Sequence, residues 1–579
     1  MDSKFPPAGG TRSNKNRTIR WLLFMLAIGC ALILGTYYWA VYVPNRQHVQ
    51  PDFQGNPKPV FYQGGMMKDP AIGSKESLKL SFETVRERID STLVYEQKTE
   101  STIITTQNKV VRLRTSELTG LINEKSFTLK FPLEKSNGKL YLPIEPLKDL
   151  YQIDLRESAE TGAVLLFKEG ETIRWFKTVA YDGKPDKTID MRRSPSIKAP
   201  ILADLRQQES VIVWGEEGDW YRVQLVSGYT GYVRKEQLAA DREETVPAKA
   251  PEPAFMPKQP ITGKINVTWE HVVSKNPDTS KIPAMPGLDV VSPTWFHLQD
   301  GDGNLQNLAD PAYVKWAKSR GYQVWALFSN GFDPKRTTEA LSTYDKRMKM
   351  TKQLLSFAQM YGLQGINIDF ENVDLDDKQN LVQFVREMTP LLHEQGLVVS
   401  IDVTPRSGSE MWSMFYDRKA LIESVDYMML MAYDEHWASS PKAGSVASLP
   451  WVESSIQGLL KEDKIPPSKL ILGIPFYSRV WTEGVKDGKT TVSSRAVFME
   501  MPQRIMREQK IEAKFDEESG QNYLEFTEEG KPAKIWIEDE TSVRARIALV
   551  KKYDLAGVAS WRRGFEVPEA WKWVNEELK

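Results

Sequence analysis

Cysteine is almost absent from this chain of 579 residues, because Cys30 is the only one. A single cysteine excludes a disulfide framework, and it also excludes a metal site built from cysteine thiolates. Histidine is scarce as well, and the five histidines do not have the spacing of metal ligands. We therefore expect no metal and no cofactor.

An excess of positive charge is also lacking. Lys and Arg number 76 against 77 Asp and Glu, so the formal net charge is -1. A protein that binds phosphates along nucleic acid needs an excess of Lys and Arg, so we expect no nucleic-acid partner. The chain is 41% hydrophobic and 26% charged, which is typical of globular proteins, and its length predicts two to four domains.

One long run without charge is present, "WLLFMLAIGCALILGTYYWAVYV" at residues 21–43. A helix of this length spans about 35 Å, enough to cross the hydrocarbon core of a bilayer. Residues 1–20 form a basic tail, which we expect to stay in the cytoplasm. We predict a single-pass anchor in the cell membrane that places the remainder of the chain outside the cytoplasm. A cleaved signal peptide is the alternative, although no small-x-small cleavage site follows the run.

Two proline-rich segments divide the rest of the chain. Residues 44–74 contain five prolines and no apolar periodicity, which predicts an extended stalk. Residues 240–262 contain another five prolines and predict a stiff linker. The segments between and after these prolines are therefore the candidate domains.

Residues 75–181 have the pattern of a small α+β domain. β-branched residues alternate in "STIITTQNKVVRLRTSELTGLINEKSFTLKF", and "GAVLLFKEGETIRWF" predicts a closing hairpin. The segment resembles the small N-terminal domain of copper amine oxidases. It contains no His or Cys and hence no copper ligands, so we expect a binding or spacer role.

Residues 185–239 show short alternating strands separated by polar turns. The stretch "MRRSPSIKAPILADLRQQESVIVWGEEGDWYRVQLVSGYTGYVRKEQL" resembles a bacterial SH3 module. We expect Trp214, Trp220, Tyr221 and Tyr232 to fill a small β-barrel. In related modules such barrels hold cell-wall peptide or glycan, and the alternative is that these aromatics only form the core.

Strands and amphipathic helices alternate throughout residues 263–579. This pattern of eight strands, with helical sequence between most of them, predicts a TIM (β/α)8 barrel. An insertion at residues 482–537 predicts a small additional α+β subdomain. The candidate strands are 264–270, 288–293, 322–328, 365–371, 397–403, 426–433, 469–476 and 556–561.

The fourth candidate strand, "GINIDFE", alternates apolar and polar side chains. Ile366, Ile368 and Phe370 should face the helices, and Asn367, Asp369 and Glu371 should face the barrel axis. Active sites of this fold lie at the C-terminal ends of the strands, where Glu371 is placed. Burying two acids is costly unless they are hydrogen-bonded or take part in chemistry. A negative Asp369 disfavours ionisation of Glu371, which predicts a general acid.

The same strand resembles the signature of glycoside hydrolase family 18, Asp-Gly-x-Asp-x-Asp-x-Glu. Asp369 and Glu371 match the last two positions, whereas Gln364 and Asn367 replace the first two aspartates. The segments "MAYD" (431–434) and "LGIPFYSR" (472–479) and the residue Trp561 resemble further family motifs. "VSPTWF" and "AYDEHWASSPKAGSVASLPW" are most similar to exported enzymes that cleave wall and spore-cortex peptidoglycan.

The resemblance implies a mechanism in which Glu371 is the proton donor. The seventh candidate strand ends without an acid, so we expect the 2-acetamido group of the substrate to act as nucleophile. Asp369 would orient that group and Tyr433 would bind its oxygen, which makes these two residues and Glu371 the predicted catalytic set. The predicted substrate-binding residues are Asn367, Trp561, Asp434, Trp295, Trp437 and Tyr477.

These features together predict a membrane-anchored extracytoplasmic glycosidase. Its expected substrate is cell-wall peptidoglycan, cut at β-1,4 bonds after N-acetylglucosamine. Chitin oligomers also present an N-acetyl group beside the bond to be cleaved, so a chitinase-like enzyme is one alternative. A non-catalytic protein that binds cell-wall glycan is the other.

Overall fold

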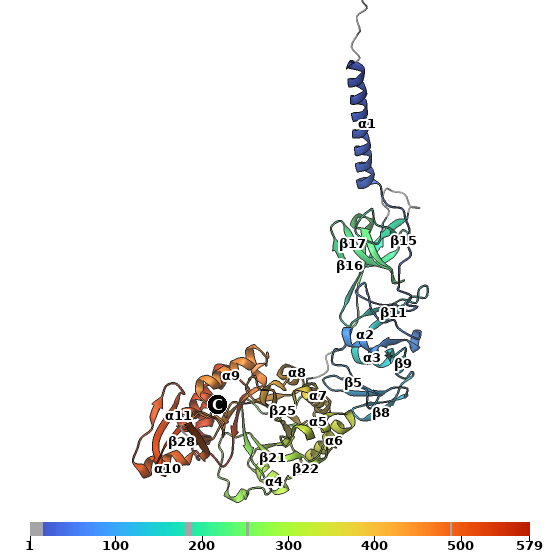
Figure 1. The fold of residues 1–579 in the computed structure, drawn as a ribbon. Coiled ribbons are helices and arrows are strands. Elements are labelled where there is room, and N and C mark those ends of the chain that lie inside the picture. Colours follow the sequence, from blue (N-terminus) through green and yellow to red (C-terminus); the bar gives the residue numbers. More distant parts are fainter. Residues whose placement is uncertain (1–14, 180–187, 251–253, 487–488) are drawn as a thin grey trace, which may run out of the picture. The chain divides into compact units, whose positions relative to one another are not determined.

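The computed structural model describes residues 15–179, 188–250, 254–486 and 489–579 (Figure 1). The chain divides into two compact units, each made of two segments. The first unit comprises Met1–Ser91 and Leu129–Pro251, and the second comprises Thr92–Thr128 and Glu252–Lys579.

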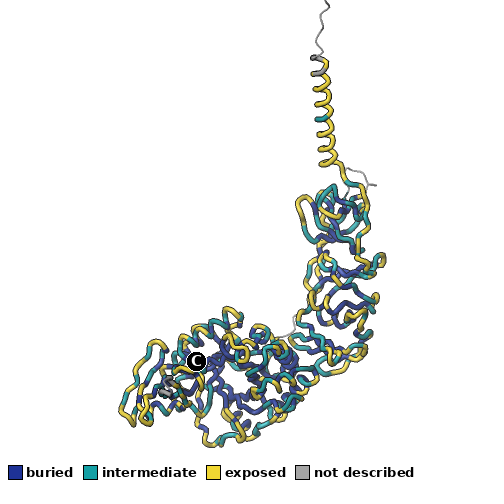
Figure 2. The backbone as a smooth tube through the Cα atoms, in the orientation of Figure 1, coloured by how far each residue is buried: buried dark blue, intermediate teal, exposed yellow. Residues whose placement is uncertain are grey.

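Helix α1, Lys15–Tyr42, contains the predicted membrane run. Its segment Ile19–Tyr42 is long and apolar enough to cross a membrane, and none of its most apolar window is buried in the protein. Figure 2 shows the helix exposed along most of its length. A core helix of a soluble protein would be mostly buried, so the anchor and the signal sequence remain the two interpretations.

Two small sheets with two helices form one part of the first unit. Strand β1 pairs in parallel with β12, and Val60 and Phe61 of β1 are buried. The predicted stalk, 44–74, is therefore wrong for residues 60–66, because their backbone pairs in a sheet and Val60 and Phe61 are buried. The elements are β1 Val60–Tyr62, β2 Gly65–Met66, β3 Lys79–Ser81, α2 Phe82–Arg88, β9 Glu134–Ser136, β10 Lys139–Pro143, α3 Ile144–Tyr151, β11 Asp154–Glu157 and β12 Val164–Phe167.

The SH3-like part of the first unit is a seven-stranded sheet in the order β15-β14-β18-β17-β16-β13-β19. Strand β13 pairs with both β16 and β19, so it belongs to this sheet and not to a hairpin of the preceding domain. The core is mainly aliphatic, and of the four predicted core aromatics only Trp220 is buried. The strands are β13 Thr172–Thr178, β14 Ile189–Arg192, β15 Ile201–Leu205, β16 Ser210–Glu217, β17 Trp220–Gln224, β18 Thr230–Arg234 and β19 Leu238–Thr245.

Eight parallel strands form a closed barrel in the second unit. The barrel closes because β20 pairs with both β21 and β33, which confirms the predicted TIM barrel. A short strand, β22 (Leu305–Asn307), adds to β21 in antiparallel orientation. The barrel strands are β20 Ile265–Glu270, β21 Val290–Leu298, β23 Gln323–Ser329, β24 Gly365–Asp369, β25 Val398–Val403, β26 Tyr427–Met431, β27 Leu470–Pro475 and β33 Gly557–Trp561.

Among the described residues, α-helices follow every barrel strand except β20, and their buried apolar side chains belong to the core of the barrel. Ile366, Ile368 and Phe370 are fully buried, and the Phe370 ring stacks on Phe384 of α7 with centroids 5.8 Å apart. The predicted orientation of these apolar side chains toward the helices is confirmed. The helices are α4 Pro311–Ser319, α5 Pro334–Leu341, α6 Tyr344–Tyr361, α7 Lys378–Glu394, α8 Arg418–Ile422, α9 Leu449–Lys461, α11 Glu540–Lys552 and α12 Ala570–Leu578.

An inserted subdomain follows β27. It is a five-stranded antiparallel sheet in the order β29-β28-β32-β31-β30 with one helix, and it begins at Tyr477. Its apolar core includes Val480, Leu524 and Ile535. The elements are β28 Tyr477–Lys486, β29 Lys489–Phe498, α10 Glu500–Gln509, β30 Lys514–Asp516, β31 Gln521–Glu528 and β32 Lys531–Ile537.

A five-stranded meander from far earlier in the chain also belongs to the second unit. Ile103 and Val110 of the meander form a buried cluster with Tyr344 and Met348 of α6 and Leu391 of α7. The predicted single domain at 75–181 is therefore divided between the two units, because this apolar face is covered by barrel helices. The strands are β4 Val94–Glu96, β5 Ser101–Thr105, β6 Val110–Arg114, β7 Thr119–Ile122 and β8 Lys125–Thr128.

Candidate active site

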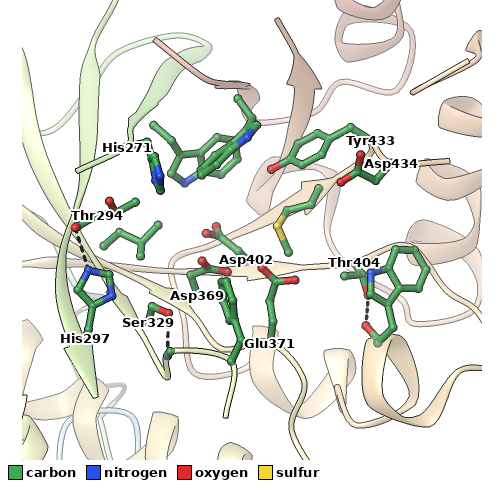
Figure 3. Close-up of a pocket in the computed structure, with 17 residues that line it drawn as sticks. His271, Thr294, His297, Ser329, Asp369, Glu371, Asp402, Thr404, Tyr433 and Asp434 are labelled. Atoms are coloured by element: carbon green, nitrogen blue, oxygen red, sulfur yellow. Dashed lines mark hydrogen bonds between the residues drawn. The ribbon is translucent and has the colours of Figure 1, made fainter. Parts of the chain in front are cut away.

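A cavity of about 330 Å³ opens at the C-terminal ends of the barrel strands (Figure 3). Its lining comes from β20, β21, β23, β24, β25, β26 and β33 or from the residues that directly follow them. Five of the predicted site residues line it together, namely Asp369, Glu371, Tyr433, Asp434 and Trp561.

Glu371 stands just beyond the end of β24, and its backbone is held on both sides. The side chain of Asn330 accepts a hydrogen bond from the Glu371 N–H at 3.1 Å and donates one to the Glu371 carbonyl at 2.7 Å. The Tyr416 hydroxyl donates to the carbonyl of Phe370 at 2.8 Å. These bonds fix the turn after the strand, and the Glu371 carboxyl lies in the cavity beside Asp369 (Figure 3).

The electrostatic environment of Glu371 suits a general acid. Burial, and secondly the charge of Asp434, raises the pKa of Glu371 to about 7. The direction agrees with the prediction, but the main causes are burial and Asp434 and not Asp369. Burial also raises the pKa of Asp369 well above its usual range, with further contributions from the charges of Glu371 and Asp402. A carboxyl with a pKa near 7 can hold its proton until it is needed for transfer.

Asn367 is fully buried and does not line the cavity. Its Oδ1 accepts hydrogen bonds from Trp269 Nε1 at 3.0 Å and from Ser292 Oγ at 3.2 Å. Its Nδ2 donates to Asp402 Oδ1 at 2.8 Å. The predicted contact between Asn367 and the substrate is therefore wrong, because the amide lies beneath the site and is used within the protein.

Asp402, on β25, is a lining residue that the sequence interpretation missed. It is 1% exposed, and its carboxyl lies close to those of Asp369 and Glu371 (Figure 3). The signal was available, because "VVSIDV" alternates polar Ser400 and Asp402 with apolar residues in the same way as "GINIDF". Two adjacent strands therefore direct acids to the same side.

Aromatic residues form another part of the cavity wall. The ring of Trp269 lies 6.0 Å from that of Trp561 and 6.5 Å from that of Tyr433, at 80° to the latter. The carbonyl of Trp561 accepts a hydrogen bond from the Phe476 N–H at 2.7 Å, which ties this strand end to β27. Burial, and next the charge of Asp402, raises the pKa of Tyr433, so its hydroxyl stays a hydrogen-bond donor at neutral pH.

Asp434 is positioned by the inserted subdomain. Its Oδ1 accepts a hydrogen bond from the Tyr477 hydroxyl at 2.5 Å and lies 3.6 Å from Arg479. Tyr477 itself is 5% exposed and lies outside the cavity lining, and its direct contact with substrate stays a prediction. Its role in the structure is to orient Asp434.

Two predicted tryptophans have different outcomes. Trp295 is fully buried in β21, where its Nε1 donates to Asn276 Oδ1 at 2.7 Å, so its prediction as a rim residue is wrong. Trp437 is 51% exposed in the loop after β26, outside the cavity lining, and its contact with substrate stays a prediction. Trp412, which follows β25, lines the cavity instead.

Comparison of the sequence with known proteins supports a glycoside hydrolase domain at the barrel. The family model for glycosyl hydrolases family 18 matches residues 278–566, and that for the bacterial SH3 domain matches residues 187–239. The chain is 30% identical to the uncharacterized glycosylase YvbX of Bacillus subtilis (strain 168) over 290 residues, which are 48% of this chain and 81% of that protein. The chain belongs to glycoside hydrolase family 18.

Relatives of this family 18 enzyme include proteins whose names describe lysis of cortical fragments or of the spore cortex. The cortical fragment-lytic enzyme of Bacillus subtilis (strain 168) is 26% identical over 236 residues, 40% of this chain and 54% of that protein. The solved structure of the Bacillus megaterium QM B1551 spore cortex-lytic enzyme SleL has a TM-score of 0.50 and 20% identity, covering 59% of this chain and 78% of that one. This structural likeness supports the barrel fold. For residues 75–181, the resemblance to the N-terminal domain of copper amine oxidases stays a prediction.

Proposed function

We propose that this family 18 glycoside hydrolase is an extracytoplasmic N-acetylglucosaminidase of cell-wall peptidoglycan. It cleaves β-1,4 bonds on the reducing side of N-acetylglucosamine and retains the anomeric configuration. The observation that mainly supports this is the position of Glu371, a carboxyl with a pKa of about 7, in one cavity with Asp369, Tyr433 and Trp561.

In the first step Glu371 donates its proton to the glycosidic oxygen as the bond from C1 to that oxygen breaks. The acetamido oxygen of the same sugar forms a bond to C1 and closes a five-membered ring, which carries the positive charge. Asp369 accepts a hydrogen bond from the acetamido N–H, and the Tyr433 hydroxyl donates to the acetamido oxygen. These two contacts hold the nucleophile in line with C1.

In the second step Glu371, now ionised, removes a proton from water. The water oxygen attacks C1, the bond from C1 to the acetamido oxygen breaks, and Glu371 recovers its proton. Two displacements at C1 leave the configuration retained. Trp561 provides an apolar face on which the sugar ring stacks.

The choice of peptidoglycan over chitin depends on features outside the chemical step. The mechanism requires only an N-acetyl group on the sugar whose bond is cut, and both polymers have it. The bacterial SH3 domain and the similarity to cortical fragment-lytic enzymes support a cell-wall substrate. The exposed apolar helix, preceded by basic residues, supports attachment to the membrane with the barrel on the outer side.

Digestion of purified peptidoglycan tests the proposal. The full-length protein, solubilised in detergent, is incubated with peptidoglycan or with chitin oligomers, and the new reducing ends are reduced with borohydride and identified by mass spectrometry. We expect reduced N-acetylglucosamine from peptidoglycan. Reduced N-acetylmuramic acid would contradict the proposed bond, and turnover of chitin oligomers alone would support the chitinase-like alternative. Glycan binding without any turnover would support a non-catalytic role.

A further inference from the structure

Asp369 and Asp402 are neighbours on adjacent parallel strands. The register pairs Ile368 of β24 with Ile401 of β25, so the two aspartates are the next residues on these strands. Adjacent strands are about 4.8 Å apart, and both side chains point to the barrel interior, where they line the cavity. Two carboxyls therefore lie at one level beneath the substrate site.

The amide beside this pair can donate to it but cannot take up a proton. The Trp269 N–H can only donate, so the atom of Asn367 that it contacts is the amide oxygen. The other atom of the amide is then the nitrogen, which donates to Asp402 Oδ1. Residue 367 thus supplies Asp402 with a neutral donor and adds no acid to the site.

Both aspartates are too deeply buried to be charged at the same time without cost. Asp369 is 8% exposed and Asp402 is 1% exposed. Among the residues that the structure describes, Asp369 Oδ1 is a buried atom with no hydrogen-bond partner. Burial raises the pKa of Asp402 as well, against the hydrogen bond from Asn367 and together with the charge of Glu371. Two close carboxyls of this kind hold one proton between them over a wide pH range.

We propose that Asp402 is a positioning residue that keeps this one proton, so that Asp369 can face the acetamido N–H as an ionised acceptor. The inference rests on the proposed function, because it assigns the charge of Asp369 in that reaction. When substrate enters, the proton resides on Asp402 and the negative charge on Asp369. The pair therefore carries one negative charge before and after binding, opposite the positive ring formed at C1.

Other titratable groups face the pair and set its surroundings. Glu371 lies just after β24, Tyr416 comes from the segment after β25, and Tyr433 and Asp434 lie just after β26. His271, just after β20, and His297, on β21, line the same cavity, and burial lowers the pKa of both, so they are neutral at pH 7. Asp402 differs from all of these because it lies beside Asp369 on the neighbouring strand.

Two substitutions at position 402 separate a protonated Asp402 from an ionised one. An asparagine at 402 can still accept from Asn367 with its oxygen and donate to Asp369 with its nitrogen, as a protonated Asp402 does. If Asp402 holds the proton, we therefore expect Asp402→Asn to leave the acidic limb of kcat close to its wild-type position. An ionised Asp402 would instead help to raise the pKa of Asp369, so its removal would move that limb to lower pH. Asp402→Leu removes the donor as well, so buried Asp369 should stay neutral to higher pH, and we expect the acidic limb of kcat to move up by about one pH unit, with roughly tenfold lower kcat on that limb.

A substitution elsewhere on β25 controls for changes in packing beneath the site. The matched control is Ser400→Ala, a buried neighbour on the same face of β25, which should leave the profile unchanged.

The measurement is kcat between pH 4 and pH 8 with N,N',N'',N'''-tetraacetyl chitotetraose and the full-length protein in detergent, alongside thermal unfolding of each variant. An acidic limb that moves to lower pH in a folded Asp402→Asn variant would overturn the inference, because it would show that Asp402 is ionised. So would a folded Asp402→Leu variant that keeps the wild-type limb. Absence of hydrolysis by the wild-type protein on chitotetraose and on peptidoglycan would instead contradict the proposed function itself.

Discussion

Glu96 and Arg347 are 251 positions apart in the chain, and their side chains form an ion pair at 2.6 Å. The Arg347 guanidinium is 3% exposed and also binds Glu387, which is fully buried, at 2.7 Å. It donates in addition to the carbonyl of Leu341 at 2.8 Å. The meander that contains Glu96 is thereby tied to α6 and α7 of the barrel, next to the apolar cluster that covers the same helices.

Replacing Arg347 by Met should destabilise the second unit strongly. The substitution leaves Glu387 buried without its cation, and breaking a buried pair in this way costs about 3–5 kcal/mol. Urea unfolding followed by tryptophan fluorescence measures the change. Arg504→Met, at an exposed i,i+4 pair of α10, is the matched control and should change stability little. Equal effects of the two substitutions would contradict the assigned role of Arg347.

Glu371→Gln should abolish most hydrolysis without loss of binding. Glutamine keeps the shape of the side chain, but its amide is too weak an acid to transfer a proton, and general acid catalysis accounts for a factor on the order of 10²–10⁴. Initial rates on peptidoglycan and calorimetric titration with chitotetraose measure the two properties. Glu517→Gln, at an exposed position of the inserted subdomain, is the control. Wild-type turnover by the Glu371 variant would refute its role as the acid.

The pH dependence of catalysis should report the raised pKa of Glu371. A general acid must be protonated, so kcat/KM should fall as pH rises through about 7, the pKa of Glu371. The charge of Asp434 contributes to this raised pKa, so Asp434→Asn should move the basic limb to lower pH. Profiles between pH 5 and pH 9 test both statements. Asp554→Asn, an exposed carboxylate in the loop before β33, is the control, and an unmoved limb in the Asp434 variant would contradict the proposed cause.

Tyr433→Phe should lower kcat/KM through loss of one hydrogen bond to the acetamido oxygen. A single neutral hydrogen bond contributes about 1.5 kcal/mol at most, which corresponds to roughly tenfold in rate. The comparison is made with Tyr523→Phe, which removes a hydroxyl in the inserted subdomain that donates to Glu525. If both variants keep the wild-type kcat/KM, the Tyr433 hydroxyl is not used in the reaction.

The local sequence pattern was sufficient to predict which way the two acids of the site face, but it was insufficient to place several aromatic residues. The alternation in β24 predicted that Asp369 and Glu371 face the barrel axis, because side chains of a strand alternate with a period of two. Trp295 belongs to a similar pattern, but its position on a buried strand with Asn276 as partner depends on neighbouring segments. Tyr477 is one more such case, since its contact with Asp434 depends on how the inserted subdomain meets the strand ends.

The positions of residues 60–66 and 94–128 show the same limit at the level of whole elements. Strand β1 is three residues long and obtains its partner, β12, more than 100 positions later. The alternation of side chains in the meander predicts strands, but it does not predict which surface covers their apolar face. The contacts with Tyr344, Met348 and Leu391 decide that it belongs with the barrel.

The sequence by itself determined the barrel, the SH3-like sheet, the apolar helix and the two acids at the end of β24, because periodicity, length and short motifs are local properties of the chain. Only the tertiary structure decided that Asp402 lies beside Asp369, that Asn367 is withdrawn from the cavity lining and that burial and Asp434 raise the pKa of Glu371. Those relationships depend on strand register, on barrel closure and on exclusion of water, and each of these exists only when segments distant in sequence are packed together.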